Sequence, residues 1–184
     1  MTMNFQTAYG ILVDPQHEGR YSKDSNDPGG ETYRGISRTK NPAWRGWVAV
    51  DVHRGSPTFE ADMDRDTALQ GMCQEFYRQG FWLPLQADSM PETIRYELFD
   101  FAVNTSQAGH PATAIKCLQR ALGVPDDGAL GPVTIAAAGL VDGNTLFRKL
   151  AAQVIRYYTG LRSDLKVQYL SGWMNRLAAN LEKM

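Results

Sequence analysis

Apolar residues recur with helical spacing in one segment after another through the greater part of this chain, and this pattern constrains the fold most strongly. Spacings of three and four residues place side chains on one face of a helix. In the segment 66–78 this face holds Leu69 and Cys73, and Asp66 is well placed to cap the N-terminus. Gly80 is expected to end this helix. The pattern predicts a mainly α protein.

Capping residues and prolines predict the boundaries of the other helices. Ser89 followed by Glu92 has the spacing of a capping box, which predicts a helix start. Pro111 suits the first turn of the next helix, and Gly123 suits its end. Asn144 is expected to cap a longer helix. The remaining predicted helices cover about 4–13, a short stretch after Pro132, and about 165–182.

The segment 19–65 is different, because it is rich in Gly, Pro, Asn and Asp and has little helical periodicity. Loops of this length inside compact domains are usually functional or disordered. The aromatic residues within it favour the functional alternative. We therefore expect an irregular or short-β active-site segment near residues 19–65.

Length and charge exclude several classes of protein. The chain has 184 residues, of which 43% are hydrophobic, and its formal net charge is −1. This length suits one well-buried domain, and a charge near zero gives no broad basic face for nucleic acid. No window approaches the roughly 20 apolar residues of a membrane span, so stable membrane insertion is not expected. No signal peptide is recognisable, and we expect a monomer that is made in the cytoplasm.

Two carboxylates near the N-terminus have the chemistry for glycosidic bond cleavage. Glu18 follows the first predicted helix, where the helix dipole and apolar neighbours would raise its pKa and keep it protonated as a general acid. Asp27 lies in a polar turn rich in glycine and proline, where it would stay ionised. Thr32 could hold a water molecule beside Asp27. Two carboxyl groups in opposed environments can act as acid and base respectively. A Glu and an Asp nine residues apart also occur by chance, so the spacing alone does not identify a catalytic pair.

Metal-dependent and thiol chemistry have less support. The three histidines, His17, His53 and His110, form no His-Glu-x-x-His motif, so a zinc peptidase or amidase is disfavoured. The two cysteines, Cys73 and Cys117, are expected to be free thiols in the core. We expect neither a metal nor an organic cofactor.

Several motifs together resemble those of the phage-type N-acetylmuramidases of glycoside hydrolase family 108. They are Glu18-Gly19-Arg20-Tyr21, Asn26-Asp27-Pro28-Gly29-Gly30-Glu31-Thr32, Gly35-Ile36-Ser37, residues 99–104 and residues 172–177. The stretch 114–138 resembles the peptidoglycan-binding-like region of the same family. The chain departs from the family in having Arg20 where glycine is usual. The gap from Asp27 to Thr32 is one residue shorter than in other phage lysozymes with a Glu-Asp-Thr arrangement.

The resemblance implies a role for individual residues. Glu18 would be the catalytic acid, and Asp27 its partner, assisted by Thr32. The residues expected to bind substrate are Tyr21, Gly30, Tyr33 and Asn104. For two of these a structural role is the alternative, namely core packing for Tyr33 and helix capping for Asn104.

The resemblance also implies a fold and an activity. We expect residues 1–184 to form a single lysozyme-like domain, with 105–184 as an integrated peptidoglycan-binding-like helical part. The implied reaction is hydrolysis of the β-1,4 bond between N-acetylmuramic acid and N-acetylglucosamine, in a phage or prophage endolysin that reaches the wall through a holin. The alternatives are a lytic transglycosylase acting on the same bond and a non-catalytic peptidoglycan-binding protein.

Overall fold

The computed structural model describes residues 2–14, 19, 21–23, 29–106, 110–161 and 163–182, with side chains of 163–169 and 182 excluded. The chain forms two compact units. One comprises Tyr9–Gln79, and the other comprises Met1–Ala8 together with Gly80–Met184. The described residues are mainly helical with one small sheet, which confirms the predicted fold class. None of the described helices is both long and apolar enough to cross a membrane.

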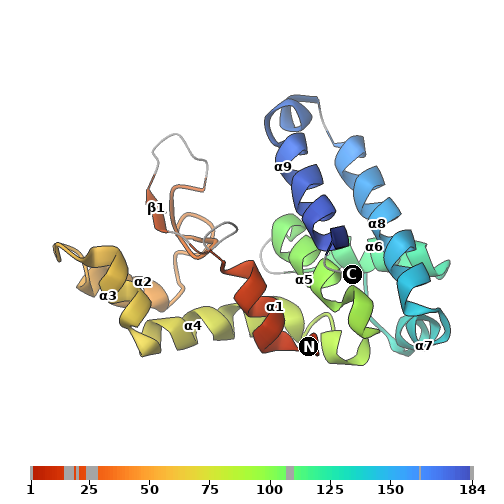
Figure 1. Cartoon of the computed structure of the whole chain (residues 1–184), viewed down its shortest axis with the longest axis horizontal. Helices are drawn as coiled ribbons and strands as arrows, with labels where there is room; N and C mark the ends of the chain where they lie inside the picture. Colours follow the sequence, from red (N-terminus) through yellow and green to blue (C-terminus); the bar gives the residue numbers. More distant parts are fainter. Residues whose placement is uncertain are drawn as a thin grey trace. The chain divides into compact units, whose positions relative to one another are not determined.

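The first unit combines a three-stranded antiparallel sheet with short helices (Figure 1). Its elements are the end of α1 (Phe5–Leu12), β1 (Tyr21–Lys23), β2 (Glu31–Tyr33), β3 (Ile36–Ser37), α2 (Gly46–Val52), α3 (Phe59–Arg65) and α4 (Thr67–Tyr77). A two-residue turn joins β2 to β3, and both of its residues have positive φ, 46° at Arg34 and 77° at Gly35. Such turns match the twist of antiparallel strands. The turn sets Tyr33 opposite Ile36, and both side chains are buried in the core.

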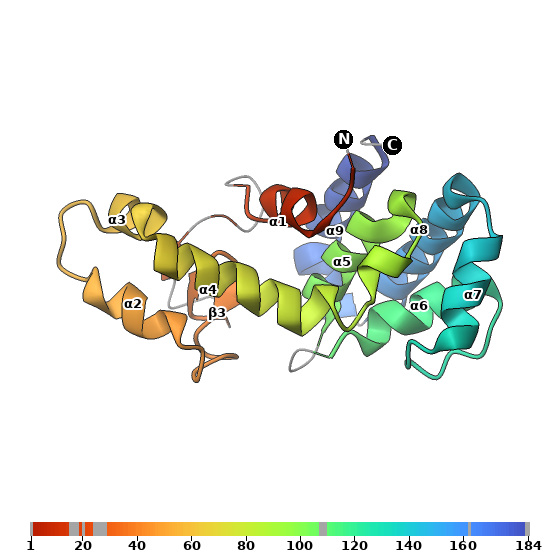
Figure 2. The same cartoon turned by 90° about the horizontal axis from the view of Figure 1, so that it is seen from below.

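The short strands agree with the expectation for residues 19–65. The expectation of an irregular backbone was wrong for two stretches of this segment, which are helical. Helices α2 and α3 each contain seven residues. Figure 2 shows both helices against α4. In α2 only Trp47 and Val50 have buried side chains, together with the backbone at Gly46, and in α3 only Met63 is buried. A helix of about two turns with so few buried positions shows no recognisable hydrophobic period in its sequence. Packing on α4 therefore stabilises two helices that the local sequence does not predict.

The start of α4 confirms one prediction, and its end corrects another. The Asp66 carboxylate accepts hydrogen bonds from the backbone N–H groups of Ala68 and Leu69. Gly80 does not end the helix, because the chain continues as a π-helical turn, η1 (Arg78–Trp82). In that turn Phe81 and Trp82 are buried. Burial of two large aromatic side chains outweighs the weak helix propensity of one glycine.

The second unit is a helical assembly around α5. Its elements are η2 (Ala87–Ser89), α5 (Glu92–Thr105), α6 (Ala112–Leu122), α7 (Pro132–Leu140), α8 (Gly143–Gly160) and α9 (Ser163–Glu182). Helix α5 contacts α6, α8 and α9, and α8 lies beside α9 (Figure 1). In the middle of α5, Phe99 packs edge-to-face on Trp82 and Phe5, with ring centroids 5.5 and 6.3 Å away.

Two of the predicted helix caps in this unit were wrong. Ser89 belongs to the 3-10 turn η2, and the capping position of α5 is Pro91, so no capping box forms. The Glu92 carboxylate instead accepts a hydrogen bond from the backbone N–H of Met3. Asn144 lies inside α8, whose cap is Asp142. The Asp142 carboxylate, one residue before Gly143, competes well for the capping position, because it accepts a 2.9 Å hydrogen bond from the backbone N–H of Thr145.

The structure confirms other local predictions in this unit. Helix α6 begins just after Pro111 and ends at Gly123, which has φ of 73°. Pro132 is the first residue of α7. Cys117, like Cys73 of the first unit, is a buried free thiol. Burial raises the pKa of the Cys73 thiol to about 12 and also raises that of Cys117, so both thiols are poor nucleophiles at neutral pH.

Candidate active site

The two carboxylates singled out from the sequence, Glu18 and Asp27, lie outside the described residues. Their catalytic roles therefore remain predictions. The neighbouring residues are described. Tyr21 opens β1 three residues after Glu18, and β2 begins soon after Gly29. Along the chain, Asp27 thus belongs to the connection between two paired strands of the sheet.

Thr32 and Gly30 lie where this connection enters the sheet. Thr32 pairs with Ser22 of β1 and Ser37 of β3, and its hydroxyl donates a 3.3 Å hydrogen bond to the carbonyl of Gly30. Gly30 has φ of 62°, and a Cβ atom there would come within 2.8 Å of the Thr39 hydroxyl oxygen. The turn therefore requires glycine for its conformation.

A serine fixes the end of the same connection. The Ser37 hydroxyl donates a 2.6 Å hydrogen bond to the Gly29 carbonyl and accepts one of 3.2 Å from the backbone N–H of Lys40. Ser37 is buried. Both bonds are partly buried, and together they hold Gly29 against β3.

Tyr21, one of the predicted substrate-binding residues, is held by two contacts. Its hydroxyl donates a 3.1 Å hydrogen bond to a carboxylate oxygen of Glu31, which lies diagonally across the hairpin on β2. Its ring packs edge-to-face on Phe59, with ring centroids 4.9 Å apart. The side chain is half-buried. Tyr21 thus has one orientation, fixed by a polar and an aromatic neighbour.

Glu31 is the centre of an ion-pair network that the sequence did not indicate. Its carboxylate accepts hydrogen bonds from Arg38, at 3.1 Å, and from Arg54. Both arginines also bind Asp51 of α2, with N–O distances of 2.6 Å for Arg38 and 2.7 Å for Arg54. The network ties β2 to α2 and to the turn that follows it. Glu31 is at least 7 residues from each of its partners, so no local motif reveals the network.

The network keeps Glu31 ionised. Burial alone would raise the pKa of this carboxyl, whose side chain is 10% exposed. Hydrogen bonds and positive charge from the arginines, with the bond from Tyr21, outweigh burial and place the pKa below its usual value. The pKa of Asp51 is lowered further, first by its bonds to Arg38 and then by those to Arg54. At neutral pH Glu31 therefore has no proton to donate.

Tyr33 is only 1% exposed. The Gln70 amide donates a 2.8 Å hydrogen bond to the Tyr33 hydroxyl, which donates in turn to Asp64 at 3.5 Å. These contacts fit the core-packing alternative. Desolvation raises the pKa of the Tyr33 hydroxyl, so it stays protonated. A role in substrate binding remains a prediction for this residue.

Asn104 belongs to the second unit, in the last turn of α5. Its amide donates a 2.7 Å hydrogen bond to the backbone carbonyl of Asp100, one turn earlier. This contact fits the alternative of a residue that stabilises the helix end. Its role in substrate binding also remains a prediction.

A second cluster of polar side chains lies inside the second unit. Glu97 and Asp100 of α5 are each 3% exposed. Arg176 of α9 pairs with Asp100 at 3.2 Å, and the Asn180 amide donates to Glu97 at 2.7 Å. Burial, followed by the negative charge of Asp100, raises the pKa of Glu97 to about 8. One arginine thus serves two carboxyl groups, and Glu97 is mainly protonated at neutral pH.

Comparisons with known proteins agree with the resemblance noted from the sequence. The family model Glycosyl hydrolase 108 matches residues 15–105, and the model Predicted Peptidoglycan domain matches residues 113–178. The solved structure "Structure of Brucella abortus SagA" has 24% identity and a TM-score of 0.70, and the match covers 97% of this chain and 92% of that chain. This likeness supports the fold. No curated protein matches. The chain belongs to glycosyl hydrolase family 108, and it is a glycoside hydrolase with peptidoglycan as its substrate partner.

Proposed function

We propose that the protein is an N-acetylmuramidase, which hydrolyses the β-1,4 bond between N-acetylmuramic acid and N-acetylglucosamine. The observation that carries this proposal is the state of Glu31. This residue opens β2, the strand that follows the connection containing Asp27, and two arginines hold it as an anion. This state of Glu31 supports Glu18, the acid that opens the family motif, as the proton donor.

In this mechanism Glu18 protonates the leaving glycosidic oxygen. Asp27 activates water or stabilises the positive charge that develops on the sugar. Thr32 assists Asp27 from the start of β2. The network around Glu31 has a positioning role, because it holds Tyr21 and the two strands that flank the connection carrying Asp27. Tyr21, Gly30, Tyr33 and Asn104 remain the proposed substrate-binding residues.

The biological setting is part of the same proposal. The enzyme would act as a monomeric phage or prophage endolysin, made in the host cytoplasm and given access to the wall by a holin. Residues 1–184 would work as one muramidase domain, with 105–184 binding peptidoglycan. The second family match, over residues 113–178, supports the binding role of this part.

The products of digestion test the reaction. Purified peptidoglycan would be digested in water enriched in ¹⁸O and the fragments examined by mass spectrometry. Hydrolysis at the proposed bond should give reducing N-acetylmuramic ends that each carry one ¹⁸O atom. Anhydro ends would identify a lytic transglycosylase instead, and released peptides on intact glycan strands would contradict glycosidase action.

The second carboxylate needs its own variant. We expect Asp27→Asn to lower the rate of hydrolysis while the protein remains folded. Asp24→Asn, three residues earlier in the same connection, removes the same charge and should retain activity. Wild-type rates in Asp27→Asn would remove Asp27 from the mechanism without affecting the assignment of Glu18.

A further inference from the structure

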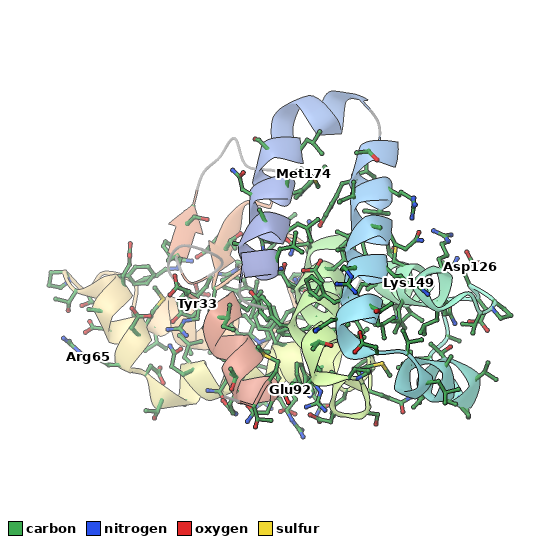
Figure 3. The ribbon with its side chains drawn as sticks, turned by 45° about the vertical axis from the view of Figure 1, so that its right-hand side comes forward. Tyr33, Arg65, Glu92, Asp126, Lys149 and Met174 are labelled. Carbon is green, nitrogen blue, oxygen red and sulfur yellow. The ribbon has the colours of Figure 1, made fainter. Side chains whose placement is uncertain are left out.

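A groove of about 500 Å³ lies in the second unit, between the end of α6 and the middle of α8. Four basic side chains line it: Arg120, Arg148, Lys149 and Arg156. Figure 3 shows Lys149 on α8, on the same side of this unit as Asp126. All four basic residues are exposed. The groove belongs to the region matched by the peptidoglycan domain model and contains none of the proposed catalytic residues.

The positive charge of the groove is local. Neither α6 nor α8 contains an aspartate or glutamate, although the chain as a whole has a net charge of −1. Arg120 has an ordinary structural partner, because it pairs with Asp126 at 2.6 Å. Its place in the last turn of α6 also suits the helix dipole. The other three basic residues, Arg148, Lys149 and Arg156, all belong to α8.

These three residues have few neutralising contacts within the chain. Arg148 donates a 3.2 Å hydrogen bond to the Thr145 hydroxyl, which carries no charge. Among the described residues, no carboxylate pairs with Arg148, Lys149 or Arg156. Lys149 and Arg156, seven residues apart, lie on one side of α8, and Arg148 is next to Lys149. Asp142 attracts Arg148 without forming an ion pair with it. An anionic ligand could pair with these charges.

The floor of the groove narrows the chemistry of that ligand. Between the basic residues it is lined by Ala121, Leu122 and Ala152, with the amide of Gln153 beside them. Apolar side chains of this kind can contact methyl groups, and an amide can bond a peptide group. The complementary ligand is a short peptide with small side chains and free carboxylates. The stem peptides of peptidoglycan, rich in alanine and bearing carboxylates, have this composition.

We propose that this groove binds the stem peptides of peptidoglycan and so retains the enzyme on its substrate. The proposal rests on the proposed function, because it names the part of the substrate that the second unit recognises. The basic residues of α8 pair with the carboxylates, and the apolar floor receives the alanine methyl groups.

Binding to intact sacculi tests the groove. The triple variant Arg148→Gln, Lys149→Gln and Arg156→Gln removes three exposed charges and should leave the fold intact. Loss of several exposed charge pairs should weaken co-sedimentation with sacculi by about tenfold. The matched control is Arg45→Gln, Arg65→Gln and Arg78→Gln, which removes three exposed charges from the first unit. This control should bind as the wild type does, and equal weakening in both variants would overturn the proposal.

Two further substrates identify the occupant. An amidase removes the stem peptides from sacculi. The wild-type protein should bind these stripped sacculi no better than the groove variant binds intact sacculi. Undiminished binding to the stripped glycan would overturn the peptide assignment. Vesicles of phosphatidylglycerol form the other arm, and a groove variant that lost only vesicle binding would identify a membrane surface instead.

Hydrolysis of peptide-free glycan strands separates this proposal from the muramidase assignment. The groove variant should cleave such strands at the wild-type rate, because they lack the proposed ligand. If the wild type released no reducing muramic ends from any substrate, the muramidase proposal would fail, whereas the binding comparison would still decide the role of the groove. A groove variant that was equally impaired on peptide-free strands would contradict the inference.

Discussion

Glu31 in the first unit and Glu97 in the second are both shielded from water, yet their pKa values shift in opposite directions. Glu31 faces two arginines that it shares with one other carboxylate, so two negative charges meet two positive charges. Glu97 lies beside Asp100, and only Arg176 supplies a formal positive charge among the described neighbours. Burial raises the pKa in both places, so the balance of charge decides the outcome.

This difference shows that a raised pKa alone does not identify a catalytic acid. Glu97 has the protonation state of a general acid, but it lies in the interface of α5 and α9 and bonds to Asn180. Glu31 lies beside the candidate site in an ionised state. Structural clusters can shift a pKa as strongly as catalytic ones. The comparison favours structural roles for Glu97 and Glu31 and is consistent with the proposal that Glu18 is the proton donor.

The largest effect should come from removing the one arginine of the buried cluster. Arg176→Met leaves Asp100 without its ion pair beside Glu97. Breaking a buried pair in this way costs about 3–5 kcal/mol. Urea unfolding at pH 7 would measure the loss. A change below about 1 kcal/mol would mean that Asp100 is already neutral or hydrated, and the contrast between the clusters would disappear.

The next effect is a pH dependence of stability. The folded-state pKa of Glu97, about 8, is above its usual value of 4.5. Its contribution to stability is thus fully present below about pH 4.5 and is lost as the pH rises through about 8. Glu97→Gln keeps an oxygen that can accept the bond from Asn180, and it should gain about 2 kcal/mol relative to wild type at pH 8. Melting temperatures of the two proteins that changed in parallel from pH 5 to 9 would contradict the raised pKa of Glu97.

A smaller effect should arise at the sheet. Gly30→Ala forces a side chain into the left-handed region and toward the Thr39 hydroxyl, which should cost about 1–2 kcal/mol. Gly30→Asn is the matched variant, because asparagine tolerates positive φ better, and it should cost less. Thermal melting would compare the two. Equal losses of stability in the two variants would mean that crowding, rather than backbone conformation, accounts for the requirement for glycine at position 30.

The smallest stability effect should be that of Asp51→Asn. Glu31 keeps both arginines, and the Arg38–Asp51 pair is more than a third exposed, so we expect a loss below about 1 kcal/mol at pH 7. The pKa of Asp51 is far below its usual value, so its contribution is present above about pH 4 and declines as the pH falls further. The variant should therefore lose less stability than the wild type on acidification below pH 4. An identical acid profile would show that Asp51 is not strongly paired.

Local rules predicted much of the fold because many boundaries depend on a single residue. The Asp66 cap and the glycine at position 123 follow from hydrogen bonding and backbone freedom within one turn. Some errors arose where packing against distant parts of the chain decides, as at Gly80 and in α2 and α3. Others arose where a nearby residue takes the capping position instead. Ser89 and Asn144 had suitable side chains, but Pro91 and Asp142 occupy the capping positions.

The candidate site was predictable only in part, for a similar reason. The strand that carries Thr32 and the turn at Gly30 lie in the segment where short strands were expected. The partners of Glu31 are 10 residues away at Tyr21 and 23 away at Arg54, so folding alone brings them together. No periodicity or motif encodes such a network.

The most direct test of the central assignment compares Glu18→Gln with Glu31→Gln in the rate of reducing-end release from purified peptidoglycan. Both changes are nearly isosteric, and circular dichroism would verify folding of each protein. We expect Glu18→Gln to lower kcat by about 10²–10⁴-fold, as loss of a general acid does. Glu31→Gln should lower the rate much less and keep the alkaline limb of the pH–rate profile. A larger loss in Glu31→Gln, with that limb abolished, would make Glu31 the proton donor and contradict the account.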